Sequence, residues 1–204
     1  MKKIIILLLM TLLLTGCTAV RIDTSSIDNI LLVLLEKNNT LYNQVGKGYK
    51  YYIPRGVTYI DTKEFNDKLY SNGNFLYLYI DAIGYYYKKE EQHTLNEDLY
   101  YSKKLDINGK VGYIEIEQQD NKYLITIYYN YTLFKALVPY KDINVTVLDA
   151  TYMLSTMKFN DNIIKLALDT DYNNLEEEYN KFKSEKETNN FLEMAEEKLE
   201  IEEW

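Results

Sequence analysis

The sequence has almost no means of cross-linking itself. Cys17 is the only cysteine among 204 residues, so no disulfide can form within the chain. Aliphatic, aromatic and other apolar residues make up 47% of the sequence, which is enough for one hydrophobic core. We therefore expect a fold that is stabilised by packing alone.

The sequence also lacks the motifs of the common enzyme classes. His93 is the only histidine, and its charged surroundings predict a solvated loop. No nucleophile-elbow motif accompanies it, which argues against a Ser-His-Asp site. A phosphate-binding Walker loop, a dinucleotide-binding glycine pattern and a zinc-ligand spacing are missing as well. We predict a protein that is not an enzyme and that uses no cofactor.

Positive charge is scarce. Lysine and arginine number 23 against 31 aspartates and glutamates, and the formal net charge is −8. An acidic surface repels phosphates, so we exclude nucleic acid as a partner. Residues 174–204 contain eleven glutamates and four lysines, a net of −7. Together with apolar residues at helical spacing, this charge predicts an acidic amphipathic helical tail.

The first residues have the pattern of a secretory signal. Lys2 and Lys3 precede an apolar run from Ile4 to Leu14, and small residues follow. The run is too short for a permanent membrane span, which needs about 20 residues. An ordinary secretory signal would leave Cys17 as an unpaired thiol outside the cell.

Leu14-Thr15-Gly16-Cys17 resembles the lipobox of bacterial lipoproteins. The resemblance implies that a diacylglyceryl group is attached to the Cys17 thiol, that a signal peptidase cuts between Gly16 and Cys17, and that the new amino group is acylated. Two or more acyl chains give a stable anchor, whereas one chain binds a membrane only reversibly. We expect the protein at the extracytoplasmic face of the cell membrane.

This assignment divides the chain into four parts. Residues 1–16 are the cleaved signal, 17–26 a lipidated tether, 27–173 the globular domain and 174–204 the acidic tail. Within the domain, apolar residues at helical spacing predict a helix that begins at Ile27, with capping candidates Asp23, Thr24 and Ser25. We expect it to be buried on the domain; the alternative, a helix that lies on the membrane, would need more basic residues than Lys37.

Alternating apolar residues and turn signals predict strands through the middle of the chain. Expected strands are Tyr49–Ile53, Val57–Ile60, Val111–Glu117 and Lys122–Tyr131, with turns at Asn72-Gly73 and Asn108-Gly109. The aromatic run Phe75–Tyr87 reads as one long strand with a bulge or bend at Gly84. A helix from Ile143 to Met157 would cover one sheet face. The segment 159–168 fits either a strand or a helix. The fold class is thus α+β, an antiparallel sheet covered by helices.

Two segments resemble the PsbP and Mog1-like α/β/α sandwich. Gly48-Tyr49-Lys50-Tyr51-Tyr52-Ile53-Pro54 is similar to its opening strand, and residues 150–159 are similar to its closing helix, with a lysine-phenylalanine pair at the end. The resemblance implies a non-catalytic module that binds partners. It carries over no functional residue, because the matched residues are structural.

Three groups of residues are candidates for binding. Tyr85, Tyr87, Tyr129 and Tyr131 belong to the densest aromatic clusters and would form a ligand surface if they point outward; filling of the core is the alternative. Asp169, Asp171 and Asn173 have calcium-loop spacing, but the turn glycine and the closing glutamate are replaced, which favours helix capping. Glu115 and Glu117 share a strand face as solvated carboxylates.

The sequence therefore predicts a membrane-anchored surface lipoprotein that acts as a binding or assembly module. Its partner is an unidentified protein or a ligand of the cell envelope. Two alternatives stay open: an enzyme that acts on the cell wall or on glycans through carboxylates, and a structural partner that docks a basic protein through its acidic tail.

Overall fold

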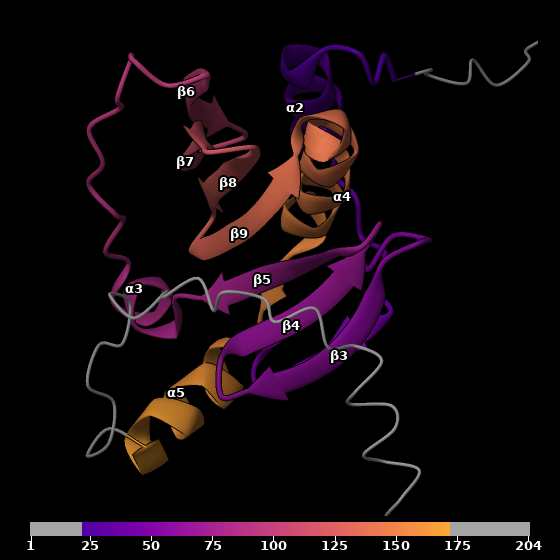
Figure 1. Cartoon of the computed structure of the whole chain (residues 1–204). Coiled ribbons are helices and arrows are strands. Elements are labelled where there is room, and N and C mark those ends of the chain that lie inside the picture. The colour runs from indigo at the N-terminus through magenta and orange to yellow at the C-terminus, as the bar shows by residue number, and fades with distance from the viewer. Residues whose placement is uncertain (1–21, 172–204) are drawn as a thin grey trace, which may run out of the picture. The chain divides into compact units, whose positions relative to one another are not determined.

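A seven-stranded antiparallel sheet forms the centre of the structure (Figure 1). The structure is a computed structural model that describes residues 22–171. In the order in which they pair, the strands are β3 (Thr58–Lys63), β4 (Asn66–Ser71), β5 (Asn74–Ile80), β9 (Thr132–Pro139), β8 (Lys122–Tyr129), β7 (Lys110–Gln119) and β6 (Tyr101–Ile107). A smaller sheet has the order β1 (Gln44–Val45), β2 (Tyr49–Tyr51) and β10 (Lys158–Phe159).

Two helices cover one face of the large sheet. Helices α2 (Ile27–Glu36) and α4 (Ile143–Thr156) pack against each other, and α4 also packs on β8 and β9 (Figure 1). Side chains alternate along the strands, as period-two patterning requires. The fully buried strand residues beneath the helices include Ile114, Ile116, Ile125, Ile127, Phe134 and Ala136. The predicted α+β class, an antiparallel sheet covered by helices, is confirmed.

Both predicted helices are confirmed. In α2, Ile30, Leu31, Leu34 and Leu35 are buried, as expected for a helix on the domain. The capping residue is Ser26 and not one of the three predicted ones, because the Ser26 hydroxyl accepts the Asn29 N–H. The β4–β5 turn at Asn72-Gly73 and the β6–β7 turn at Asn108-Gly109 are also confirmed. All four turn residues have positive φ, which asparagine and glycine tolerate best.

The prediction of one strand from Phe75 to Tyr87 is wrong. Strand β5 ends at Ile80, and helix α3 (Ala82–Tyr87) follows. Asp81 begins the helix, since its carboxylate accepts the Gly84 N–H at 2.7 Å. A Cβ atom at Gly84 would lie 2.1 Å from an Asp81 oxygen, so the glycine permits the capping contact and does not mark a bulge.

Strand β8 stops earlier than predicted. Asn130 and Tyr131 both have positive φ and form a two-residue turn into β9, a strand that the sequence did not reveal as separate. The Asp81 N–H donates to the Tyr131 carbonyl at 2.9 Å, which fixes the turn against the start of α3.

The unassigned segment 159–168 contains the end of β10 and most of helix α5 (Asp161–Asp171). Between β9 and α4 lies the short 3-10 helix η1 (Tyr140–Asp142). The chain divides into two compact units, Met1–Asp169 and Thr170–Trp204. Only Thr170 and Asp171 of the second unit belong to the described residues. The predicted signal, the first half of the tether (17–21) and the acidic tail at 174–204 lie outside them.

A buried carboxylate connects the small sheet to the large one. Asp67 on β4 is 1% exposed and accepts hydrogen bonds from Tyr49 Oη at 2.7 Å and Tyr51 Oη at 2.8 Å, both on β2. The Thr62 hydroxyl on β3 donates to the same carboxylate. Burial, followed by the charge of Asp67, raises the pKa of both tyrosines well above the usual range. These phenols therefore stay protonated donors.

We predict that Tyr51→Phe lowers the free energy of unfolding by about 1–3 kcal/mol, because a buried carboxylate loses one of its donors. Urea unfolding followed by circular dichroism measures the loss. Tyr52→Phe is the matched control, since that hydroxyl makes no hydrogen bond among the described residues, and it should cost less than about 0.5 kcal/mol. Equal losses in the two variants would contradict a role for the Asp67 contact.

A second buried carboxylate belongs to α4. Asp149 is 8% exposed, and the Ser71 hydroxyl lies 3.4 Å from its Oδ2. Burial raises the pKa of Asp149 to about 6, and the Ser71 contact offsets the shift only in part. A carboxyl whose pKa is higher in the folded than in the unfolded protein stabilises the fold most when the pH lies below the unfolded pKa, which is near 4. This contribution to stability is lost as the pH rises through the folded pKa of about 6.

We predict that Asp149→Asn stabilises the protein by about 1–3 kcal/mol at pH 7.5 and has almost no effect at pH 4, where Asp149 is already neutral. Urea unfolding of both proteins at several pH values between 4 and 8 gives the comparison. A difference between variant and wild type that does not change with pH would show that Asp149 does not titrate in this range.

Candidate functional site

The predicted tyrosine surface is divided between the core and one end of the sheet. Tyr129 on β8 is 1% exposed, so it does not point outward as a tyrosine surface would require, although it contributes to the lining of a pocket described below. Its side chain points to the helix-covered face, and its hydroxyl donates to the Ile107 carbonyl at 2.9 Å. Tyr128 and Tyr129 are adjacent, and on a strand two adjacent side chains point to opposite faces of the sheet. The sequence alone did not decide which face Tyr129 takes.

Tyr85 and Tyr131 do come together, just beyond the end of β8 at Tyr129. Their rings meet edge to face at 5.6 Å, while the Tyr85 ring also stacks on Phe159 at 4.2 Å. The Tyr85 hydroxyl donates to Asp161 at 2.5 Å, and Lys88 Nζ lies 3.8 Å from the ring centroid. Burial and the Asp161 bond raise the pKa of Tyr85 to about 12. Tyr85 is thus engaged in joining α3, β10 and α5.

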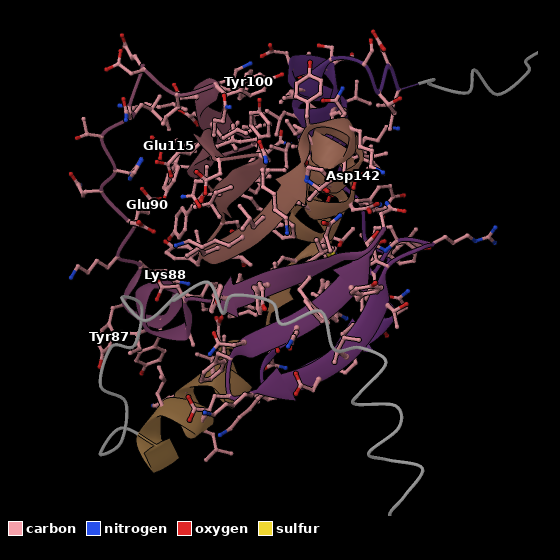
Figure 2. All side chains as sticks on the ribbon, viewed as in Figure 1. Tyr87, Lys88, Glu90, Tyr100, Glu115 and Asp142 are labelled. Atoms are coloured by element: carbon pink, nitrogen blue, oxygen red, sulfur yellow. The ribbon has the colours of Figure 1, made fainter. Side chains whose placement is uncertain are left out.

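Tyr87 is the most exposed of the four predicted tyrosines. It is 59% exposed at the end of α3 and meets Tyr86 edge to face at 5.1 Å (Figure 2). Of the predicted surface, Tyr87 alone presents most of its ring to solvent.

A tyrosine triad that the sequence analysis missed lies at the opposite end of β8. Tyr100, Tyr123 and Tyr140 come from the segment before β6, from β8 and from η1. Ring centroids are 5.1 Å apart for Tyr100 and Tyr123 and 5.7 Å apart for Tyr123 and Tyr140. In the sequence, only the position of Tyr140 directly after Pro139 pointed to this triad. The three tyrosines are brought together by strand pairing between residues that are far apart in the sequence.

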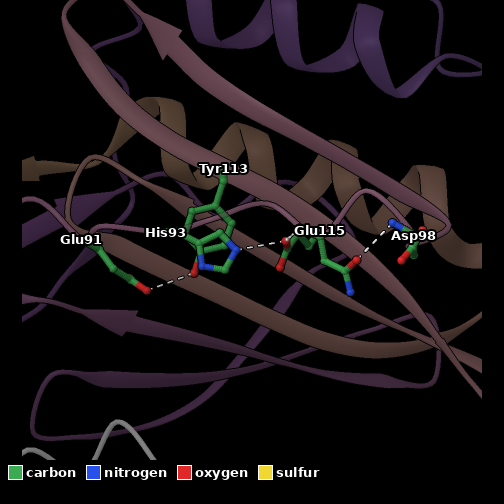
Figure 3. A network of polar contacts seen from close by, with 6 residues as sticks. Glu91, His93, Asp98, Tyr113 and Glu115 are labelled. Carbon is green, nitrogen blue, oxygen red and sulfur yellow. Dashed lines mark hydrogen bonds and ion pairs between the residues drawn. The ribbon is translucent and has the colours of Figure 1, made fainter.

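His93 is more enclosed than a solvated loop histidine. The segment 88–100, called the strap below, connects α3 to β6 (Figure 1). Its residues Glu91 and His93 lie beside Tyr113 and Glu115 of β7 (Figure 3). The His93 ring stacks on Tyr113 with centroids 3.8 Å apart, and Tyr113 stacks in turn on Tyr128. Nε2 lies 3.0 Å from Glu115 Oε1, although the N–H is not aligned for a hydrogen bond.

Other strap residues add backbone and side-chain contacts to the same strand. The Asn96 N–H donates to Glu115 at 2.9 Å, and the Tyr113 hydroxyl donates to Glu91 at 3.2 Å. Burial, ahead of the charge of Glu91, raises the pKa of Tyr113. Glu115 therefore serves the strap, whereas Glu117 accepts from the neighbouring Gln119 amide.

This network holds a loop in place. Within residues 22–171, His93 contacts Tyr113 and Glu115, and no serine or threonine hydroxyl hydrogen-bonds to it. Across the same residues, no group of three or more histidine, cysteine, aspartate or glutamate side chains is placed to bind a metal ion. Asp169 and Asp171 lie in the last turn of α5, and Asn173 lies outside the described residues.

A pocket of about 350 Å³ opens where α2 ends. Its lining includes Lys37, Asn108, Lys110, Ser155 and the predicted Tyr129. The Asn108 amide donates to the Leu35 and Glu36 carbonyls and so satisfies the helix terminus. Burial, ahead of repulsion from Lys158, lowers the pKa of Lys110. The pocket is polar, and the Asn108 amide that lines it is hydrogen-bonded to the end of α2.

Comparisons with known proteins add little to this geometry. No family model matches the sequence, and no curated protein matches it. Among solved structures, the chain is similar to a GTP-binding regulator from Thermotoga maritima at 17% identity and a TM-score of 0.25. That match covers 63% of this chain and 87% of the other. A TM-score this low supports no inference about function, and the PsbP and Mog1-like resemblance stays a prediction.

We predict that His93→Ala loosens the strap without unfolding the domain. Loss of a stacked ring of this kind is worth about 0.5–1.5 kcal/mol, which corresponds to a roughly 2- to 10-fold rise in local opening. Limited trypsin cleavage at Lys88 and Lys89 measures the opening, with urea unfolding as the check on the whole fold.

His93→Phe is the matched control for the ring. It keeps a flat aromatic group over Tyr113 and removes the contact with Glu115, so cleavage close to the wild-type rate would assign the effect to stacking. An unchanged cleavage rate in His93→Ala would show that the histidine does not hold the strap.

Proposed function

We propose that this protein is a lipid-anchored lipoprotein of the bacterial cell surface, and that its α+β domain is a non-catalytic binding or assembly module. The observation that carries the proposal is Leu14-Thr15-Gly16-Cys17 behind two lysines and an apolar run. Cys17 is the only thiol in the chain, so an acylating enzyme has one chemically suitable target.

Residues 22–171 are compatible with an anchor of this kind. Among them, none of the helices has the length and apolar composition of a membrane span. The described chain starts at Ile22, five positions after Cys17, and a helix of the domain begins at Ile27. In our proposal, acyl chains on Cys17 hold the protein, and the domain stands close to the lipid surface.

The described polar side chains support binding over catalysis. Asp67 is saturated by tyrosine and threonine hydroxyls, and His93 and Glu115 hold the strap. Each of these groups has a structural task that explains its burial. The exposed side chains include aromatic ones, with Tyr87 59% and Tyr140 63% exposed, beside aliphatic ones such as Val45 at 65%, and aromatic side chains are typical of contact surfaces.

We predict that Cys17→Ala abolishes membrane attachment. In bacteria that express the full chain, the wild type should incorporate an alkyne-tagged fatty acid and enter the detergent phase on phase separation, because acyl chains are the proposed anchor. The variant should lose the label and retain the uncleaved signal. Fractionation, label detection and the mass of the mature N-terminus check the three parts.

Thr18→Ala is the matched control, because it changes the next residue and leaves the lipobox intact. It should behave as the wild type in all three measurements. Retention of the fatty-acid label in Cys17→Ala would disprove the anchor. Release of the protein into the medium with a free Cys17 thiol would do so as well.

A further inference from the structure

The tyrosine triad is an exposed aromatic surface with a defined position on the domain. Tyr100 is 49% exposed and Tyr140 63% exposed, and their centroids are 6.2 Å apart. Tyr123 lies between them on β8 and is partly buried. The three rings come from separate segments, so the folded sheet and η1 create the surface.

Contacts of the N-terminal segment place this surface where the tether enters the domain. The Asn144 amide donates to the Thr24 carbonyl at 3.0 Å and to the Ser25 carbonyl at 3.1 Å. Asn144 follows Tyr140 by four residues, which is about one helical turn, or about 6 Å. On the other side, the Tyr101 hydroxyl donates to Asp28 at the start of α2 at 3.0 Å, and Tyr101 is the neighbour of Tyr100. Figure 2 shows Tyr100 beside α2 and Tyr87 beside α3.

The length of chain before Ile22 limits the distance to the anchor. Five residues from Cys17 to Ile22 span at most about 17 Å even when fully extended. The aromatic cluster around Tyr85 and Tyr131 lies beyond the opposite end of β8, where the strand ends at Tyr129. From Tyr123 to Tyr129 the strand alone extends about 20 Å at about 3.3 Å per residue. The two ends of β8 are therefore unequal in their access to the lipid.

We propose that the tyrosine triad contacts the lipid surface to which Cys17 is attached, with its rings at the level of the headgroups. This inference rests on the proposed lipid anchor. Tyrosine suits that depth because its ring is apolar and its hydroxyl remains hydrated. The contact orients the domain on the membrane, so that Tyr87 and α3 point away from it.

Charge and ring geometry favour lipid over a glycan. Near the triad, the carboxylate of Asp28 is paired with Lys103, and Lys141 stands next to Asp142. The Asp28–Lys103 pair carries no net charge, and the contact that we propose does not depend on anionic lipid. The rings of Tyr100 and Tyr140 are 85° apart, and those of Tyr100 and Tyr123 are 66° apart. Rings at such angles do not form the flat platform on which a sugar ring stacks, but they fit a disordered headgroup layer.

The test uses the complete mature chain, Cys17–Trp204, coupled through its single thiol to maleimide-bearing lipid in phosphatidylcholine vesicles. Coupling in this way makes the result independent of whether cells acylate Cys17. In a Trp204→Phe background, Tyr100→Trp and Tyr140→Trp place a fluorophore in the triad, and Tyr87→Trp places one at a site of similar exposure near α3. We expect brominated phosphatidylcholine to quench the two triad probes about twofold or more strongly than the Tyr87→Trp probe.

A second measurement needs no substitution. Nitration of the wild-type chain by tetranitromethane, read by mass spectrometry, should be reduced at Tyr100 and Tyr140 when the protein is coupled to vesicles, and unchanged at Tyr87. Equal quenching of all three probes and equal nitration in both states would overturn the proposal. Protection of the triad by soluble N-acetylglucosamine oligosaccharides, without quenching by lipid, would also overturn it and assign the surface to a glycan.

Discussion

Burial of one face of the sheet beneath α2 and α4 is the interaction on which the rest of the structure depends. The only thiol lies outside the described domain, so no covalent link supports the fold. Alternation on β7, β8 and β9 sends Ile114, Ile125 and Phe134 to the same side, where Val147 and Leu154 of α4 meet them. At about 25 cal/mol per Å² of buried apolar surface, such a layer supplies the main favourable term in folding. The two buried carboxylates, Asp67 and Asp149, are placed at the margins of this layer.

Local signals in the sequence were sufficient for much of this architecture. Helices α2 and α4 follow from apolar spacing, and the turns at Asn72-Gly73 and Asn108-Gly109 follow from residues that accept positive φ. Helix α3 could not be predicted from composition, because its tyrosines have strand propensity and its start depends on one contact, between Asp81 and Gly84. The same limit applies to Tyr131, whose positive φ is fixed by the Asp81 N–H and the Tyr85 ring.

The candidate sites were harder to predict than the fold, because each one depends on residues distant in sequence. Tyr129 was assigned to a surface from its neighbours, yet strand parity sends it into the core. His93 was assigned to solvent from its charged surroundings, yet the strap places it between Tyr113 and Glu115. The tyrosine triad needs the β8–β9 register and the position of η1 together. Residue type indicated which side chains have useful chemistry, and pairing decided which of them meet.

The sheet gives this domain two chemically different ends. At the end of β8 near Thr24, the rings of Tyr100 and Tyr140 are exposed and have hydroxyls, and the nearby Asp28 carboxylate is paired with Lys103. At the other end, the Tyr85 hydroxyl donates to Asp161 and Lys88 lies over the Tyr85 ring, and Tyr87, the residue before Lys88, is exposed. An uncharged aromatic surface suits an interface that is partly apolar, whereas aromatic rings among charges suit recognition in water. Under the proposed lipid anchor, a short N-terminal tether holds the first end closer to the membrane, and an aqueous partner then has its best access to the second.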